Sequence, residues 1–153
     1  MLSTLLLSGC TDSDFSLTAE DAVGTWHAGS NLPTQLELVE GGVFTVTDWP
    51  LNVRCGGGSP RTVKALQGSG TVDFAGTWEE GESGSLNALT LYPDGEACPI
   101  SSITAQFRSE SGVKYACLSL GVPNELSNAE NFFILYLGEP HETPKSNACY
   151  SYN

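Results

Sequence analysis

Few residues in this chain have types and spacings that could support chemistry, and the most specific arrangement is an S-x-x-K sequence. Ser111 and Lys114 stand three positions apart, as they do in enzymes that form an acyl intermediate. In those enzymes the motif lies on a helix, which brings the two side chains to one side. Here it straddles an expected β-turn, and no K-T-G or S-D-N sequence accompanies it. We interpret the match as coincidental, and the sequence contains no G-x-S-x-G, P-loop, G-x-G-x-x-G or H-E-x-x-H motif. We therefore predict that the chain is not an enzyme.

Metal-binding side chains are also sparse. Imidazole could come only from His27, in an expected strand, and His141, in a proline-punctuated loop. An acidic group across an expected hairpin could hold Ca²⁺ loosely, but its spacing matches no calcium-binding loop. It comprises Glu79, Glu80 and Glu82 with Asp94 and Glu96. We predict a solvated acidic face there, no metal site and no cofactor.

The overall charge excludes one class of partner. Eighteen Asp and Glu stand against six Lys and Arg, which gives a formal net charge of -12. Nucleic-acid binding requires clustered Lys and Arg to neutralise phosphates. We therefore expect no nucleic-acid partner.

The N-terminal sequence predicts where in the cell the protein is located. A short apolar run is followed by Leu7, Ser8, Gly9 and Cys10, an order that resembles the lipobox of bacterial lipoproteins, which are cut before an acylated cysteine. We expect residues 1–9 to be a lipoprotein signal peptide, or the last part of a longer one, because the run is short for a signal peptide. The alternative is an apolar terminus with an accidental cysteine. Cleavage would leave a lipidated Cys10 and a polar spacer to residue 16, and would anchor the protein to the outer face of the cell membrane.

The number of cysteines agrees with export. Once Cys10 is set aside an even number remains, which suits disulfides in an oxidising compartment. No C-x-x-C pair occurs, which argues against structural zinc. The four disulfide candidates are Cys55, Cys98, Cys117 and Cys149.

The elements that position these residues are predicted to be mainly β-strands. In a hairpin whose inner face is apolar, the alternation of side chains determines the loop length. In two hairpins, a three-residue loop with Gly at the left-handed position places the apolar residues of both strands on one face. The predicted loops and inward pairs are residues 40–42 with Leu38 opposite Phe44 and Leu36 opposite Val46, and residues 110–112 with Phe107 opposite Tyr115 and Ala105 opposite Cys117.

The remaining elements complete an all-β pattern. Thr18 and Asp21 are spaced nearly as in a capping box, which predicts a short helix before the first strand. Residues 132–137 form a nearly continuous apolar run that suits a strand buried on both faces. Further strands are expected over residues 71–78, 87–92 and, last, 149–152.

An internal repeat suggests a disulfide pairing. The tripeptide G-T-W occurs at residues 24–26 and 76–78, and an L-x-L strand and a turn follow each copy. This half-repeat fits a meander in which two similar hairpins lie side by side. Cys55 and Cys98 each fall beyond the repeated turn, so Cys55–Cys98 with Cys117–Cys149 is favoured among three possible connectivities.

The tryptophans of the repeat have two interpretations. Trp26 and Trp78 could form a floor on which a ligand stacks, or they could be paired anchors of the core. We favour the core interpretation and keep both residues as candidate ligand contacts.

Two families provide resemblances. The sequence G-T-W after a short helical turn resembles the start of lipocalins, whose eight-stranded barrels enclose an apolar cavity; this match covers three residues and the order of elements. Most of the mature chain is similar to uncharacterised actinobacterial lipoproteins with a lipobox, two G-T-W sequences and an L-x-L-x-x-G-G-x-F-x-x-x-D hairpin, here residues 36–48. Residues 135–140 resemble their final strand and turn. This second resemblance implies a location and a fold, and no activity.

Together these features predict one all-β domain over residues 17–153, with about eight antiparallel strands in a meander. We expect a small barrel, with a β-sandwich as the alternative, and one short N-terminal helix. The expected protein is a monomeric, lipid-anchored, non-catalytic envelope protein that binds an unknown protein or the cell wall. The alternatives are a lipocalin-like carrier of a small hydrophobic ligand and an enzyme of unrecognised type. Many large inward residues favour a filled barrel over a carrier.

Overall fold

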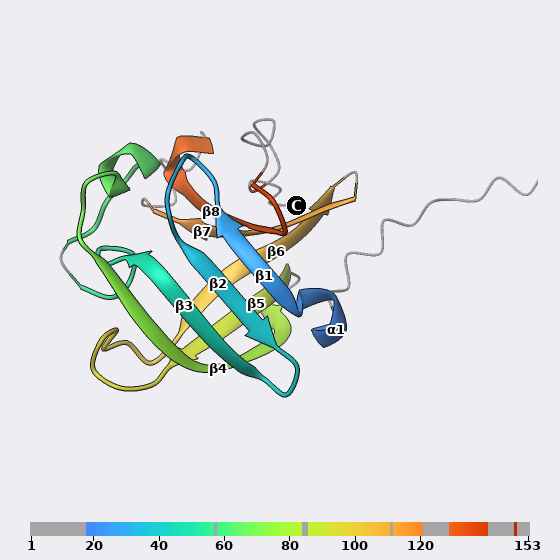
Figure 1. Ribbon diagram of the computed structural model, residues 1–153. Helices are drawn as coiled ribbons and strands as arrows, with labels where there is room; N and C mark the ends of the chain where they lie inside the picture. Colours follow the sequence, from blue (N-terminus) through green and yellow to red (C-terminus); the bar gives the residue numbers. More distant parts are fainter. Residues whose placement is uncertain are drawn as a thin grey trace, which may run out of the picture.

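The computed structural model describes residues 18–56, 58–83, 86–110, 112–120, 129–140 and 149. This part of the chain is a closed barrel of eight antiparallel strands in sequence order, in which β8 returns to pair with β1 (Figure 1). The predicted all-β barrel with one short N-terminal helix is confirmed, and the alternative sandwich is wrong. The elements are α1 (Ala19–Ala22), β1 (Gly24–Ala28), β2 (Gln35–Val39), β3 (Val43–Pro50), η1 (Val63–Leu66), β4 (Thr71–Ser83), β5 (Leu86–Pro93), β6 (Ile103–Glu110), β7 (Val113–Ser119), η3 (Ala129–Asn131) and β8 (Phe132–Leu137).

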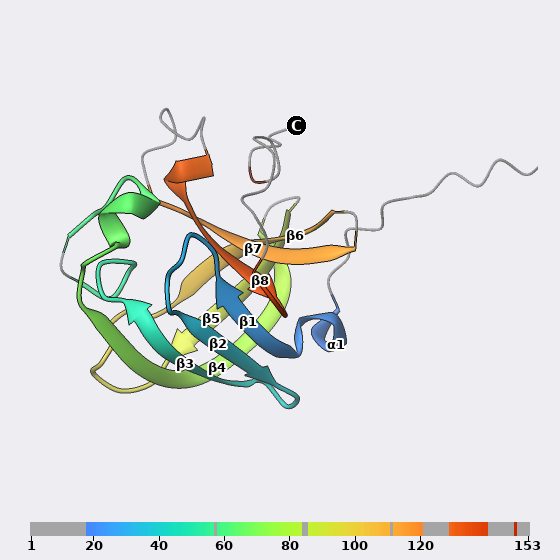
Figure 2. The ribbon, with the colours of Figure 1, turned by 45° about the horizontal axis from the view of Figure 1, so that its top comes forward.

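The two ends of the barrel differ (Figures 1 and 2). The end that carries α1 and the turn of residues 40–42 is called the helix end here. The opposite end, called the loop end, carries the connection of residues 51–70 between β3 and β4, which includes η1, and the connection of residues 94–102 between β5 and β6. None of the helices in the described residues is long and apolar enough to cross a membrane.

The helix α1 is short and held by a complete capping box. The Thr18 side chain accepts a hydrogen bond from the Asp21 backbone N–H, and the Asp21 carboxylate accepts one from the Thr18 backbone N–H. These contacts satisfy donors that a helix start leaves free, which is why so short a segment is helical. The predicted helix start is confirmed.

The first hairpin has the predicted register. Leu38 pairs with Phe44 and Leu36 pairs with Val46, and all four side chains are buried. Gly42 has a φ of 84°, so the turn uses glycine in the left-handed region as expected.

The second hairpin differs from the prediction by one residue. Glu110 pairs with Val113, so residues 111–112 form the connection, and Phe107 lies opposite Ala116 instead of Tyr115. A slip of one residue exchanges the faces of a strand, and Tyr115 and Cys117 therefore lie on the outer face. Phe107 already packs edge-on against Trp26 inside the barrel, with centroids 6.0 Å apart. A small Ala116 beside Phe107 fits that interior, where a second large ring would be overpacked.

The inward side chains form one contiguous core. Trp49 is central to its aromatic part, because its ring contacts both Phe74 and Phe133 edge-on. The indole N–H groups of Trp26, Trp49 and Trp78 donate to the carbonyls of Ala22, Val53 and Val39, respectively. Large buried rings thus occupy the interior with their polar atoms satisfied.

The strand β8 is buried on both faces, as predicted. Phe133 and Leu135 belong to the barrel core. A second group, called the outer cluster here, covers the outside and comprises Tyr115, Cys117, Phe132, Ile134, Tyr136 and Cys149. Burial raises the pKa of Tyr136 to about 12. Of the predicted last strand, Cys149 is not in a strand and residues 150–152 lie outside the described residues.

The two G-T-W copies are not equivalent in the fold. They lie on β1 and β4, and because successive strands alternate in direction, these two strands run in opposite senses. The turn after the first copy is at the helix end, whereas residues 93–95 are at the loop end. The prediction of two similar hairpins side by side is therefore wrong, and β3 separates the two pairs.

Candidate functional site

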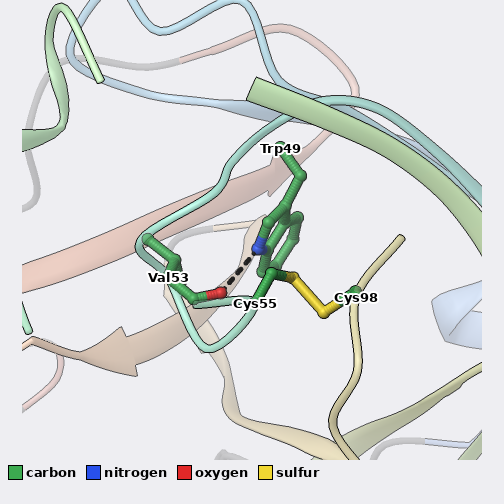
Figure 3. The surroundings of a disulfide bond; sticks show 4 residues. All are labelled: Trp49, Val53, Cys55 and Cys98. Carbon is green, nitrogen blue, oxygen red and sulfur yellow. Dashed lines mark hydrogen bonds between the residues drawn. A yellow bond between two sulfur atoms is a disulfide. The ribbon is translucent and has the colours of Figure 1, made fainter. Parts of the chain in front are cut away.

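Both predicted disulfides are present. Cys55 is bonded to Cys98, with Cα atoms 4.4 Å apart, and Cys117 is bonded to Cys149. The first bond ties the two long connections of the loop end together. It lies beside the Trp49 indole, whose N–H donates to the Val53 carbonyl at 2.8 Å (Figure 3). The bond therefore covers the aromatic core at this end of the barrel.

The two candidate tryptophans have different environments. Trp26 is fully buried and its indole N–H donates to Ala22 at 2.8 Å, which makes it a core anchor. Trp78 is 6% exposed and lines a surface hollow. Of the two candidate ligand contacts, the structure therefore places only Trp78 beside this hollow.

This hollow, called the helix-end groove, has a volume of about 660 Å³. Such a volume suits a small organic ligand or a short segment of peptide. Three segments meet around it: α1 and the residue that follows it, the turn between β2 and β3, and the middle of β4. Its lining residues are Ala19, Glu20, Val23, Glu40, Gly41, Gly42, Trp78, Glu79 and Glu80.

One wall of the groove is α1, and two contacts fix it. Ala22 is fully buried and accepts the hydrogen bond from Trp26. On the other side of the helix, Asp21 forms an ion pair with Lys114 of β7 at 3.2 Å. The hydroxyl and backbone N–H of Thr18, followed by Lys114, hold the pKa of Asp21 below its ordinary value. The helix is thus attached both to the core and to the neighbouring hairpin.

The opposite wall is the turn between β2 and β3, and it is attached to β4 at Trp78. The Trp78 backbone N–H donates to the Gly42 carbonyl at 2.8 Å, and the indole N–H donates to the Val39 carbonyl at 3.1 Å. A β-carbon at position 42 would lie 3.2 Å from the Trp78 carbonyl oxygen, so the glycine permits this close approach. The groove therefore has two fixed walls with Trp78 between them.

The rim of the groove is acidic. Glu20, Glu40, Glu79 and Glu80 are all exposed. The carboxylate of Glu79 accepts a hydrogen bond from the Tyr92 hydroxyl, and this bond raises the pKa of Tyr92. Lys114, a basic residue next to α1, is already paired with Asp21. The groove thus combines a mostly apolar floor with negative charge.

A smaller hollow of about 260 Å³ lies at the loop end, with Asn52, Val53, Arg54 and Leu120 among its lining residues. Of the described residues that line it, Arg54 alone is charged, and the Arg54 guanidinium donates to the Ser119 carbonyl at 3.0 Å. The guanidinium therefore already makes a contact that joins the connection between β3 and β4 to the end of β7. We regard this hollow as part of the packing of the loop end.

The other residues considered from the sequence do not converge. Lys114 lies on β7 next to α1, whereas Ser111 lies outside the described residues. The His27 ring donates from Nδ1 to the Gly138 carbonyl at 2.6 Å, and His141 also lies outside the described residues.

The acidic group proposed for Ca²⁺ is divided between the two ends. Glu79 pairs with Thr90 and lines the helix-end groove, whereas Asp94 follows β5 at the loop end and donates its backbone N–H to Ala75. Within the described ranges, no three His, Cys, Asp or Glu side chains are placed to hold a metal ion. The idea that these acids gather across one hairpin is therefore wrong.

The groove itself was not predicted. Glu20, Val23 and Glu40 carry no sequence signal that separates them from ordinary surface residues. Of the other lining residues, Trp78 is a candidate ligand contact from the sequence, and Glu79 and Glu80 belong to the acidic group considered for Ca²⁺. Comparisons with protein-family models, with curated proteins and with solved structures find no match to this chain.

Proposed function

We propose that this chain is a lipid-anchored, non-catalytic binding module of the bacterial cell envelope. The observation that carries the proposal is that the four cysteines other than Cys10 are consumed in two disulfides. Disulfides persist in oxidising compartments outside the cytoplasm. This pairing supports export, and export supports the interpretation of Cys10 as the site of acylation.

The position of α1 fits such an anchor. The described chain begins at Thr18, at the helix end, and seven residues separate it from Cys10. An extended chain advances by at most ~3.6 Å per residue, so Cys10 is within about 30 Å of Thr18. Acyl chains on Cys10 would therefore hold the helix end, and the groove there, near the membrane surface.

The packing of the barrel favours surface binding over carriage in the interior. The inward side chains include three buried tryptophans and form one contiguous cluster. An eight-stranded barrel holds a small ligand only where its side chains leave room. The helix-end groove, in contrast, is open at the surface with fixed walls. We therefore prefer a binding module to the lipocalin-like carrier.

The test is to express the full chain in a bacterium that processes lipoproteins and to fractionate the cells. We expect the protein in the membrane fraction, with an N-terminal peptide that begins at Cys10 and carries acyl mass. Without reduction, alkylation should find no free thiol. The Cys10→Ser variant is the control and should lack the acyl mass. A cytosolic protein with an unmodified N-terminus and free sulfhydryls would overturn the proposal.

A further inference from the structure

The helix-end groove has the composition of a site for a ligand that is both apolar and charged. Its floor contains Val23, which is 37% exposed, and Trp78, which is 6% exposed. An exposed valine between a helix and a strand is apolar surface that the described part of the fold leaves uncovered. A ligand with a hydrocarbon body would remove this surface from water, at a gain of ~25 cal/mol per Å².

The charge around this floor selects the sign of the ligand. Among the described residues that line the groove are four glutamates and no Lys or Arg. Three basic residues, Arg54, Arg61 and Lys64, belong to the connection between β3 and β4 at the opposite end. The groove therefore attracts cations and repels anions.

We propose that the helix-end groove binds an organic cation with an apolar body, its hydrocarbon against Val23 and Trp78 and its ammonium groups toward the glutamates of the rim. This inference rests on the proposed role as a binding module and names the chemical class of its ligand. Such a ligand is complementary to the groove in both apolar surface and charge. A neutral hydrocarbon would leave the carboxylates unpaired, and a small inorganic cation would leave the floor exposed.

The experiment uses the full chain carrying Cys10→Ser, purified with both disulfides formed, and the probe is diaminooctane. Binding is followed by NMR, using the Val23 methyl groups and the indole N–H of Trp78. The indole of Trp49 is an internal reference, because it is buried at the loop end. We expect saturable shifts at Val23 and Trp78 and none at Trp49.

Two related compounds separate the contributions of charge and hydrocarbon. Octanediol has the same body without charge, and ethylenediamine has the charge without the body. We expect ethylenediamine to bind about tenfold or more weakly than diaminooctane, since burial of two methylene groups accounts for such a factor. We expect octanediol to bind about fivefold more weakly, because it makes no ion pairs with the rim. Equal binding of octanediol or of ethylenediamine would overturn the proposal.

Matched variants test the position of the site. Glu40→Gln with Glu80→Gln removes two rim charges, and we expect the Kd of diaminooctane to rise about fivefold, because each exposed ion pair contributes little. The control, Glu37→Gln with Glu130→Gln, makes the same change in net charge at exposed residues outside the groove. It should leave the Kd within about twofold. An equal rise for both variants would show nonspecific attraction to the acidic protein and overturn the proposal.

The binding experiment and the test of the lipid anchor can fail independently of each other. An acylated, membrane-bound protein that does not bind diaminooctane would refute only the ligand class. Binding by a protein that is not acylated in its host would refute only the anchor.

Discussion

Gly76 lies directly against the main chain of Tyr92 on the neighbouring strand. A β-carbon at position 76 would be 2.0 Å from the Tyr92 carbonyl oxygen and 2.9 Å from a ring carbon of Phe44. Neither neighbour can withdraw without disturbing the barrel, because one is backbone in the β4–β5 ladder and the other is a fully buried core ring.

This contact predicts a large effect of Gly76→Ala. We expect the free energy of unfolding to fall by about 3 kcal/mol, because the added methyl group overpacks the site. Gly81→Ala is the matched control, since it lies on the same strand and a β-carbon there would meet no atom within 4 Å. Urea unfolding followed by tryptophan fluorescence measures both. Similar losses in the two variants would contradict the steric explanation.

The disulfide at the loop end should contribute strongly to stability. Cys55 and Cys98 are 43 residues apart in sequence, and the restriction of an unfolded loop of this length corresponds to about 4 kcal/mol. We expect Cys55→Ala with Cys98→Ala to lower the free energy of unfolding by that amount in urea. An unchanged midpoint would show that the bond adds no stability.

The carboxylate of Asp21 should titrate below its ordinary range. The side-chain hydrogen bond from Thr18 is the largest single cause, and the hydrogen bond and charge of Lys114 also lower the pKa. The pKa of Asp21 should therefore rise in both Thr18→Val and Lys114→Met. Carboxyl NMR titration measures these shifts, and an unchanged pKa in Thr18→Val would refute the assignment.

The same shift has a consequence for stability. Because the folded pKa is below the unfolded value, the contribution of Asp21 is present above the unfolded pKa and is lost as the pH falls through the folded pKa. The stability difference between the wild type and Thr18→Val should therefore be larger at neutral pH than at about pH 2, well below the unfolded Asp value. Urea unfolding at the two pH values tests this, and an equal difference would count against the assignment.

The hydrogen bond of the Trp26 indole N–H should contribute more to the stability of the fold than that of the Trp78 indole N–H. Trp26→Phe leaves the carbonyl of the fully buried Ala22 without its donor, and an unsatisfied buried acceptor costs about 1–3 kcal/mol. Trp78 is slightly exposed and its hydrogen bond is only partly buried, so Trp78→Phe should cost less. Thermal unfolding of the two variants gives the comparison. A larger loss for Trp78→Phe would be inconsistent with this account.

Much of the barrel could be predicted because the alternation of side chains along a strand is a local property. It determined the register of Leu38 with Phe44, where one face is apolar and the other polar. It failed on β7, where apolar residues occupy both faces because the outer cluster covers the outside. With no polar face to orient Tyr115 and Ala116, the two registers of that hairpin could not be distinguished from the sequence.

The predicted disulfide pairing was correct, but the reason given for it was wrong. The internal repeat suggested equivalent positions for Cys55 and Cys98, yet they lie in connections of different topology. They meet because β3 and β5 both end at the loop end of the barrel. The helix-end groove could not be predicted at all, because segments around residues 20, 41 and 79 come together only in the closed barrel.

The pairing of Trp26 with Leu137 and of Ala28 with Leu135 joins the first strand of the barrel to the last. A nascent or truncated chain that lacks β8 therefore has two unpaired strand edges, at β1 and β7, and exposed edges of this kind favour aggregation. The native topology cannot be completed until residues more than 100 positions apart have met, a long-range contact that slows folding. Any deletion that removes β8 should thus affect solubility before it affects any binding surface.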